Sequence, residues 1–361
     1  MKNNQKTVVI GLSGGVDSAV AALLLKKKGY KVIAAFMKNF SDTKNPLTGD
    51  CSYLEEKKMA QRVASKLKIP FVVFDFEKEY KNLVMDQMYK DYQKGLTPNP
   101  DISCNTIIKF PLFWEEAKKL GADYIAMGHY ARIKKVGKEF QLFAGKDKSK
   151  DQSYFLYELS QQDLSHTLFP IVNLTKEEVR KTAKSLNFPN WNKKSTRGIC
   201  FVGKVNMISF LSKKIKKSPG KVITPEGKTI GTHDGVQYYT IGQKVGPHLG
   251  IEIKKEFPQE KYYIADKLKN NKLVVAPNGH PSLKKQEVKL INFHLINQKE
   301  RVPKKLKARI RHLGILHSGN FEKENQGYKF NFDRPLEAIA PGQSLVLYSK
   351  NRVIGGGQIA K

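Results

Sequence analysis

The chain has 361 residues, 40% of them hydrophobic, so it is long enough to form two or three domains with hydrophobic cores. Its 64 lysines and arginines against 33 aspartates and glutamates give a formal net charge of +31, which favours a polyanionic partner such as nucleic acid. A composition that merely fills solvated surfaces with lysine would give the same excess. No stretch reaches the roughly 20 continuous apolar residues of a membrane helix and the N-terminus has no apolar signal core, so we expect a cytoplasmic protein with no membrane partner.

The cysteines limit the chemistry that is open to the chain. Cys51, Cys104 and Cys200 are too few for a disulfide framework, and none has the Cys-x-x-Cys spacing of a metal site. We therefore predict no bound metal. Each cysteine is either a small buried apolar residue or a working thiol.

The first predicted unit is a strand, a glycine-rich turn and a helix. An apolar run at 8–12 precedes Ser13-Gly14-Gly15-Val16-Asp17-Ser18, and apolar residues with helical spacing follow. Two adjacent glycines let backbone N–H groups point into one hollow, and the helix N-terminus adds partial positive charge. An ordinary strand-to-helix connection would look similar, but the flanking hydroxyls and Asp17 favour a site for nucleotide phosphate.

This turn is neither of the two commonest phosphate loops. It lacks the Gly-Lys-Ser/Thr of a P-loop and the Gly-x-Gly-x-x-Gly of a dinucleotide site. It resembles instead the pyrophosphate loop of the ATP pyrophosphatases. That resemblance implies that ATP is cleaved to AMP and pyrophosphate while an oxygen is adenylated.

The first third of the chain alternates between strand-like and helical stretches. Apolar β-rich runs lie at 8–12, 32–36, 71–74 and 124–127, and the main helical stretches lie at 55–67 and 113–120. This alternation predicts a doubly wound α/β domain with a parallel sheet. Met37, Gly128 and His129 follow strands, at the edge where such sheets bind ligands, although each could equally serve packing or a turn.

Two prolines flank Asn99 in the segment 96–105, which predicts a rigid loop leading into a helix after Asn105. Cys104, three residues after Asp101 and near this helix start, is placed for a lowered pKa and nucleophilic reactivity. Alternatively, Cys104 packs in the core and Asp101 caps the helix. The local sequence does not separate these interpretations.

A later stretch carries the third cysteine. A helix is predicted to open at Thr175, with Glu178 at the spacing of a capping box. Farther on, Cys200 follows two lysines and an arginine, which would favour its thiolate. Cys200 could equally be a core residue beside its apolar neighbours.

From about Ser218 short β-like runs and Gly, Pro and Asn turns replace the long helices. Runs at 288–295, 306–313, 328–332 and 344–348 predict a small antiparallel β-barrel at the C-terminus. We predict a catalytic domain at 1–203, a central linking domain at 204–281 and a C-terminal β-barrel at 282–361. Arg309 and Arg311 would lie on the same face of a strand. That face would either bind phosphates or simply be the solvent-exposed side of a half-buried strand.

Taken together, the motifs resemble those of the tRNA-specific 2-thiouridylases over nearly the whole chain. They are, in order, Gly11 to Ser18, Phe36 to Asn39, Thr97 to Asp101 with Cys104-Asn105, Gly128 to Tyr130, Lys150 to Leu156, Gly198 to Phe201, Gly231 to Gly235, Tyr239 to Gln243 and Pro341 to Gln343. Their joint presence in this order makes the resemblance specific.

The resemblance implies that ATP, with Mg²⁺, adenylates the 2-oxygen of the wobble uridine, position 34, in tRNAs of the Lys, Glu and Gln type. Cys200 would carry a persulfide from a sulfur donor, either a cysteine desulfurase or a sulfur-relay protein, and Cys104 would be the nucleophile that attacks it. Turnover would end in a disulfide of these two cysteines, so a reductant is needed. Asp101 would act as acid or base, and Asn99, Pro100 and Asp101 would contact a flipped-out target base.

The resemblance also implies the binding residues. ATP would contact Gly11, Leu12, Ser13, Gly14, Gly15, Val16, Asp17, Ser18, Met37 and Gly128. tRNA would contact His129, Lys150, Asp151, Gln152, Arg309, Ile310 and Gln343. The chain departs from the family at Ser195-Thr196-Arg197, where Asp-Ser-Thr is common, and the added cation would lower the pKa of Cys200 further. Cys51 is interpreted as structural or incidental.

Two other functions fit parts of the sequence. Another ATP pyrophosphatase, such as an amide-forming synthetase or a 4-thiouridine synthase, would share the loop, but an amide synthetase has no reason to carry the Cys104 and Cys200 motifs. A catalytically inactive tRNA-binding protein would bind tRNA without ATP turnover. The intact loop and both thiols argue against it.

Overall fold

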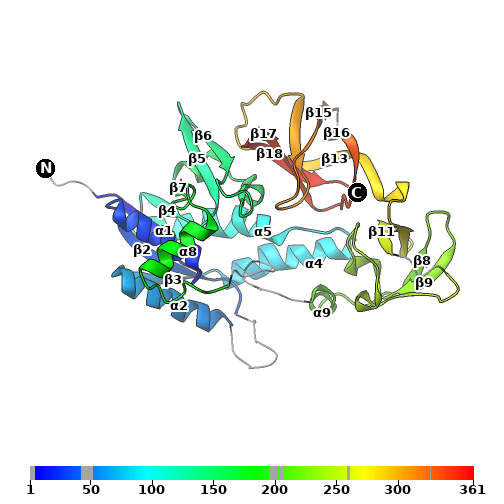
Figure 1. The fold of residues 1–361 in the computed structure, drawn as a ribbon, viewed down its shortest axis with the longest axis horizontal. Coiled ribbons are helices and arrows are strands. Elements are labelled where there is room, and N and C mark those ends of the chain that lie inside the picture. Colours follow the sequence, from blue (N-terminus) through cyan, green and yellow to red (C-terminus); the bar gives the residue numbers. More distant parts are fainter. Residues whose placement is uncertain are drawn as a thin grey trace.

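The computed structural model describes residues 5–41, 52–194, 200, 202, 206–257, 261–325 and 327–361. Figure 1 shows an N-terminal α/β lobe, a C-terminal barrel, and central strands beyond the far end of helix α4 (Asp86–Gln93). This confirms the predicted fold class of a doubly wound parallel-sheet domain, a small linking domain and a C-terminal antiparallel β-barrel. Across these ranges no helix combines the length and the apolar character that crossing a membrane requires.

Five parallel strands in the described residues form the N-terminal sheet, in the order β3-β2-β1-β4-β7. They are β1 (Thr7–Gly11), β2 (Lys31–Lys38), β3 (Phe71–Asp75), β4 (Tyr124–Ala126) and β7 (Thr167–Leu168). The first four match the predicted runs closely. The sequence analysis missed β7 because two residues are too few to give a pattern.

Helices cover both faces of this sheet, because the central strand β1 presents apolar side chains to each face. One layer contains α1 (Val16–Lys27), α2 (Ser52–Leu67) and α8 (Lys176–Ser185). The other contains α3 (Glu77–Glu79), the π-helical segment η1 (Tyr80–Met85), α4, α5 (Pro100–Ser103), the π-helical segment η2 (Cys104–Leu112) and α6 (Phe113–Lys119). Val8 and Ile10 of β1 pack into the first layer, whereas Val9 packs into the second, whose core includes Cys104.

The helix near the second cysteine begins earlier than predicted. Asn99 is the N-cap of α5, and its side-chain oxygen accepts the backbone N–H of Asp101 at 3.2 Å. Pro100 occupies the first turn, where a missing N–H costs nothing, so the proline starts the helix instead of stiffening a loop. The prediction of a helix only after Asn105 is therefore wrong, and the capping residue is Asn99, not Asp101.

The central strands form a second sheet in the described residues, in the order β10-β9-β8-β12-β11. Its strands are β8 (Gly220–Ile223), β9 (Thr229–His233), β10 (Ile251–Ile253), β11 (Tyr262–Lys267) and β12 (Lys272–Pro277). Shorter helical turns are η3 (Ser153–Leu156), α7 (Gln161–Ser165), α9 (Met207–Ser212), η4 (Val236–Tyr238), η5 (Pro247–Leu249) and η6 (Pro281–Leu283).

The C-terminal strands close into a barrel because the first strand, β13, also pairs with the last, β18. The strands are β13 (Lys284–Leu295), β14 (Lys305–Arg309), β15 (His317–Glu324), β16 (Gly327–Glu337), β17 (Ser344–Ser349) and β18 (Arg352–Ile359). The expected strand at 306–313 ends at Arg309, so Arg311 does not share its face along a strand.

A hairpin from the N-terminal lobe joins this barrel. It consists of β5 (Ala131–Val136) and β6 (Glu139–Ala144), and β6 pairs with β18. The two lobes therefore share one continuous sheet, and Figure 1 shows the hairpin reaching up beside the barrel. No strand was predicted at 131–144, because the hairpin's partner lies more than two hundred residues away, outside the reach of a local pattern.

Candidate active site

The glycine-rich turn after β1 is packed so closely that only glycine fits at its centre. Gly14 has φ +73°, and a Cβ there would lie 2.6 Å from the carbonyl oxygen of Glu56. Gly128, after β4, approaches from the other side, where a Cβ would lie 2.8 Å from the backbone nitrogen of Ser18. The turn is thus held between α2 and the end of β4.

The two serines of the turn have different environments. The Ser18 hydroxyl is buried, donates to the carbonyl of Gly15 at 3.0 Å and accepts the backbone N–H of Ser13 at 3.3 Å. Ser13 itself is exposed in the turn that precedes α1. This arrangement keeps Ser13 and the helix N-terminus open to a phosphate while Ser18 holds the shape of the turn.

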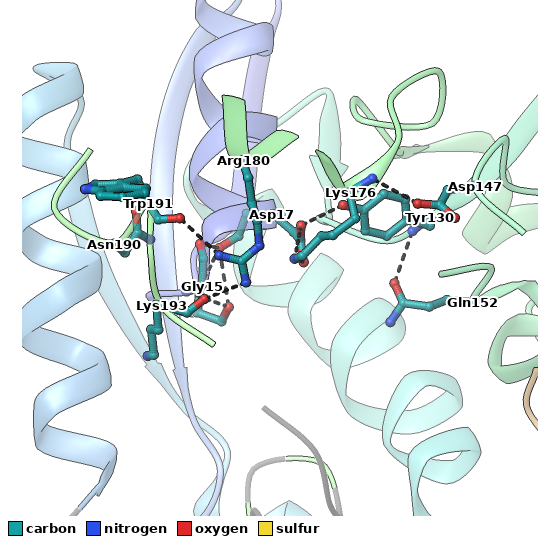
Figure 2. Close-up of polar contacts among 12 residues, drawn as sticks. Gly15, Asp17, Tyr130, Asp147, Gln152, Lys176, Arg180, Asn190, Trp191 and Lys193 are labelled. Carbon is teal, nitrogen blue, oxygen red and sulfur yellow. Dashed lines mark hydrogen bonds and ion pairs between the residues drawn. The ribbon is translucent and has the colours of Figure 1, made fainter. Parts of the chain in front are cut away.

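Asp17 is held by two residues to which the sequence analysis gave no role at the turn. The Lys176 ammonium lies 2.6 Å from each of its carboxylate oxygens, and the Tyr130 hydroxyl donates to Oδ1 at 2.8 Å (Figure 2). Burial and the Asp17 carboxylate raise the pKa of Tyr130, so this hydroxyl stays protonated as a donor. The capping box confirmed at Thr175 places Lys176 as the first residue of α8, but nothing in the local sequence pointed it at the turn.

The segment that leads toward Cys200 also packs on this turn. The Asn190 amide donates to the carbonyl of Gly14 at 3.0 Å. Arg180 of α8 donates to the carbonyls of Trp191, at 3.2 Å, and Lys193, at 2.9 Å (Figure 2). The position of this segment therefore depends on the shape of the glycine-rich turn.

The two thiols lie next to each other at the core between the sheet and its second layer of helices. The Sγ atoms of Cys104 and Cys200 lie 3.8 Å apart, both as free thiols, although 96 residues separate them in the chain. Asp101 accepts the backbone N–H of Cys200 at 2.9 Å, and the Tyr80 hydroxyl donates to the carbonyl of Cys200 at 2.5 Å. The fold alone thus brings both predicted thiols and Asp101 together.

Charges around the pair favour one thiolate, on Cys200. Burial raises the pKa of Cys104, and its hydrogen bond to Cys200 adds to this. That hydrogen bond lowers the pKa of Cys200, with further help from the Lys109 ammonium, which donates a hydrogen bond to the same sulfur. Burial opposes the charge on Lys109, but the two thiols outweigh it and raise the pKa of Lys109.

The sequence analysis missed Lys109. A lysine inside the apolar run Ile107-Ile108-Lys109-Phe110 was the available signal. In a π-helical segment residues about four to five apart lie on one face, so Lys109 stands on the same face as Cys104. A periodicity of 3.6 does not predict this alignment.

Comparison with known proteins identifies the family. The family model described as the tRNA methyl transferase HUP domain matches residues 6–204, the tRNA methyl transferase PRC-barrel domain matches 208–277, and the aminomethyltransferase beta-barrel domain matches 285–359. The chain is 44% identical to the tRNA-specific 2-thiouridylase MnmA 1 of Geobacillus kaustophilus over 367 residues, covering 98% of this chain and 95% of that protein. It is 42% identical to the tRNA-specific 2-thiouridylase MnmA of Shouchella clausii, covering 100% and 98%.

The chain belongs to the tRNA-specific 2-thiouridylase family. The family and the enzyme class predicted from the motifs are thereby confirmed. A solved 4-thiouridine synthetase–RNA complex with bound ATP covers 58% of this chain and 50% of its own at 16% identity, with a TM-score of 0.36.

In this family member the residues expected at the sheet edge are mostly buried. Met37 and His129 are each 7% exposed, and the His129 ring packs against the rings of Phe110 and Phe169. Burial lowers the pKa of His129 well below its usual value, so its ring is neutral. Within the described residues, His129 Nδ1 and both amide atoms of Asn39 have no hydrogen-bond partner. Buried polar atoms of this kind are the ones a bound ligand would satisfy.

The residues expected to contact tRNA lie in two groups. Asp151 and Arg309 form a buried ion pair of 2.7 Å, and Ile310 is buried next to it. Gln152 is in the same segment as Asp151, after half-buried Lys150, and its side chain accepts the backbone N–H of Tyr130 at 3.1 Å. Gln343 stands apart from this first group.

The Gln343 amide donates to the carbonyl of Thr97 at 2.7 Å and to that of Pro98 at 3.3 Å. It therefore contacts the segment that leads into Asn99, Pro100 and Asp101. Cys51 and the departure at Ser195-Thr196-Arg197 lie outside the described residues. In the described part of the chain, no group of three or more His, Cys, Asp or Glu side chains could hold a metal ion.

Proposed function

We propose that this protein replaces the 2-oxygen of the wobble uridine, position 34, in tRNAs of the Lys, Glu and Gln type with sulfur, at the cost of one ATP. The observation that carries this is the 3.8 Å approach of Cys104 and Cys200 beside Asp101, in a chain with an intact pyrophosphate-type loop. An amide-forming synthetase would have no use for a paired thiol site. Full-length similarity to proteins named tRNA-specific 2-thiouridylases supports the same activity.

The first step activates the base. Residues 11–18, with Met37 and Gly128, hold ATP, which binds as its Mg²⁺ complex. The uracil 2-oxygen attacks the α-phosphorus, pyrophosphate leaves, and the base carries AMP on its former carbonyl oxygen. Ser13 and the N-terminus of α1 supply N–H and O–H donors for the phosphates.

The second step delivers sulfur. The lowered pKa of Cys200 makes it the better acceptor of persulfide sulfur from a donor protein, because the thiolate is the reactive form. The terminal persulfide sulfur attacks C2 of the adenylated base, and AMP leaves. Cys104 then attacks the sulfur of Cys200, breaking the S–S bond to the base sulfur. Thiolated tRNA is released and a Cys104–Cys200 disulfide remains, which a dithiol reductant reopens with two electrons.

Asp101 is placed to move protons in both steps. Its carboxylate accepts the backbone N–H of Cys200, which fixes it beside the thiols. Burial raises its pKa, although that hydrogen bond opposes the shift. A carboxyl group with a raised pKa can give and take a proton closer to neutral pH.

The tRNA side of the site is assigned to the surfaces around these residues. Asn99, Pro100 and Asp101 line the pocket of the flipped base, and contacts to tRNA come from His129, Lys150, Asp151, Gln152, Arg309, Ile310 and Gln343. The catalytic domain is residues 1–203, the linking domain 204–281 and the barrel 282–361. The sulfur donor is a cysteine desulfurase or a sulfur-relay protein.

Reconstitution tests this function. Purified protein with ATP, unmodified tRNA, a persulfide donor and a dithiol should yield AMP and 2-thiouridine, measured by mass spectrometry of tRNA nucleosides. Appearance of 4-thiouridine instead would mean that the protein is a 4-thiouridine synthase. Binding of tRNA without AMP formation would mean an inactive tRNA-binding protein.

A further inference from the structure

Lys176 places a cation directly at the nucleotide turn. Its Nζ lies 2.6 Å from both carboxylate oxygens of Asp17, and its side chain keeps 13% of its surface exposed (Figure 2). The Asp17 side chain is 30% exposed. The pair is therefore partly shielded from water yet reachable by a ligand that enters at the turn.

The turn itself supplies no cation. Ser13-Gly14-Gly15-Val16-Asp17-Ser18 contains none, whereas a P-loop sends its own lysine onto the phosphates of a nucleotide. Backbone N–H groups and a helix N-terminus provide only partial charges. A site that expels pyrophosphate needs positive charge where negative charge develops on the leaving group.

Helix stability does not explain Lys176. It is the first residue of α8, where a positive charge opposes the helix dipole. Docking of α8 against α1 does not explain it either, because Val179 and Ala183 are already fully buried in the core that α8 shares with α1. Neither the helix dipole nor the apolar contacts of α8 therefore account for a lysine at this position, and its ion pair with Asp17 places it at the turn.

The second cation on this face of α8, Arg180, already has hydrogen-bond partners in the protein. Arg180 lies one turn after Lys176 and donates to the carbonyls of Trp191 and Lys193, which hold the chain that leads toward Cys200. Lys176 instead has a side-chain partner. A carboxylate can yield an ammonium group to a phosphate chain that carries more negative charge.

We propose that Lys176 binds the phosphate chain of ATP and stabilises the departing pyrophosphate, taking the role that a P-loop gives to its own lysine. Asp17 holds the ammonium in place before nucleotide binds, and Tyr130 keeps the carboxylate oriented when Lys176 leaves it. Lys176 is thus a further catalytic residue, supplied by a helix about 160 residues away along the chain. This assignment rests on the proposed function in one respect, that the nucleotide is ATP.

The test compares nucleotide affinities of the full-length protein by calorimetry, with a non-hydrolysable ATP analogue and with adenosine. Lys176→Met should weaken binding of the analogue about tenfold or more, the loss of one charged contact, and change binding of adenosine less than about twofold. Lys176→Arg should recover part of the loss. Lys181→Met, on an exposed position of the same helix, is the matched control and should bind like wild type.

Two results would overturn the assignment. One is wild-type affinity of Lys176→Met for the analogue. The other is an equal loss for the analogue and adenosine together with a lower melting temperature, which would make Lys176 a structural residue. If wild type makes no thiolated tRNA yet Lys176→Met still loses analogue affinity, the proposed function fails and the phosphate assignment stands.

Discussion

The side-chain amide of Gln343, in the turn before β17 of the barrel, donates a 2.7 Å hydrogen bond to the backbone carbonyl of Thr97 in the N-terminal lobe. The same short segment receives two more contacts. The N–H of Thr97 donates to the carbonyl of Pro341 at 2.8 Å, and its hydroxyl donates to that of Thr240 in the central domain at 3.3 Å. All three parts of the chain therefore meet two residues before Asn99, the cap of the helix that carries Asp101.

Gln343→Ala should slow turnover even where tRNA is saturating, because it frees the segment that positions Asp101. Loss of its hydrogen bonds to the carbonyls of Thr97 and Pro98, about 1 kcal/mol for each well-formed bond, predicts a fall in kcat of several-fold. The measurement is steady-state thiolation over a range of tRNA concentrations. Gln286→Ala, which removes an amide-to-carbonyl bond to Phe332 elsewhere in the barrel, is the matched control and should leave kcat unchanged. A rise in KM for tRNA with normal kcat would make Gln343 a tRNA contact only.

Lys109→Met should shift the reactivity of the thiol pair to higher pH. The pKa of Cys200 is lowered by its hydrogen bond from Cys104 and by Lys109, so its thiolate forms at a lower pH than that of an ordinary cysteine. Removing the ammonium removes part of this effect, and the pKa of Cys200 rises. The rate at which iodoacetamide alkylates Cys200, measured by mass spectrometry over a range of pH, should therefore begin to rise at a higher pH in the variant.

The matched control for this experiment is Lys81→Met, an exposed lysine on the neighbouring segment η1. It should keep the wild-type pH profile. An unchanged profile in Lys109→Met would show that the ammonium does not stabilise the thiolate.

Arg309→Met should destabilise the protein strongly. Its guanidinium pairs with Asp151, and the two side chains are only 12% and 2% exposed. Removing the arginine leaves a buried carboxylate without its counter-charge, which costs about 3 kcal/mol or more. Thermal unfolding should show a clearly lower midpoint, and the double variant Asp151→Asn with Arg309→Met should recover part of it.

The exposed pair of Lys118 and Glu115 provides the comparison. Lys118→Met should change stability by about 1 kcal/mol at most, because exposed ion pairs contribute little. Equal midpoints for Arg309→Met and wild type would contradict the buried-pair account. In that case Arg309 would be free to act on tRNA alone.

The sequence predicts the parallel sheet, because apolar strand-like runs and a glycine-rich turn are local patterns. Both thiols were assigned from the resemblance of their motifs to the family, since the local sequence left each of them open. The sequence does not predict that Lys109 and Lys176 join the site. Lys109 aligns with Cys104 only through a π-helical segment, and Lys176 reaches Asp17 only because α8 packs on α1. Both depend on tertiary packing.

For the residues expected to contact tRNA, the sequence likewise does not predict which other residues they bind in the folded protein. Arg309 and Asp151 were both predicted as contacts from motif resemblance, but their mutual ion pair joins segments 158 residues apart. The sequence alone also gave no indication that Gln343 hydrogen-bonds the Thr97 carbonyl. In each case the pattern identified the residue and the fold determined its partner.

The central claim is that Cys104 and Cys200 together carry and release the sulfur. Its most direct test is a single turnover with Cys200 preloaded as persulfide, ATP, tRNA and no reductant, followed by mass spectrometry of both protein and tRNA. We predict one Cys104–Cys200 disulfide for each 2-thiouridine formed, and in Cys104→Ser a protein joined to tRNA through the two sulfurs on Cys200, with AMP released and little or no free thiolated tRNA. Wild-type yields of 2-thiouridine from Cys104→Ser, or thiolation without the disulfide, would contradict the account.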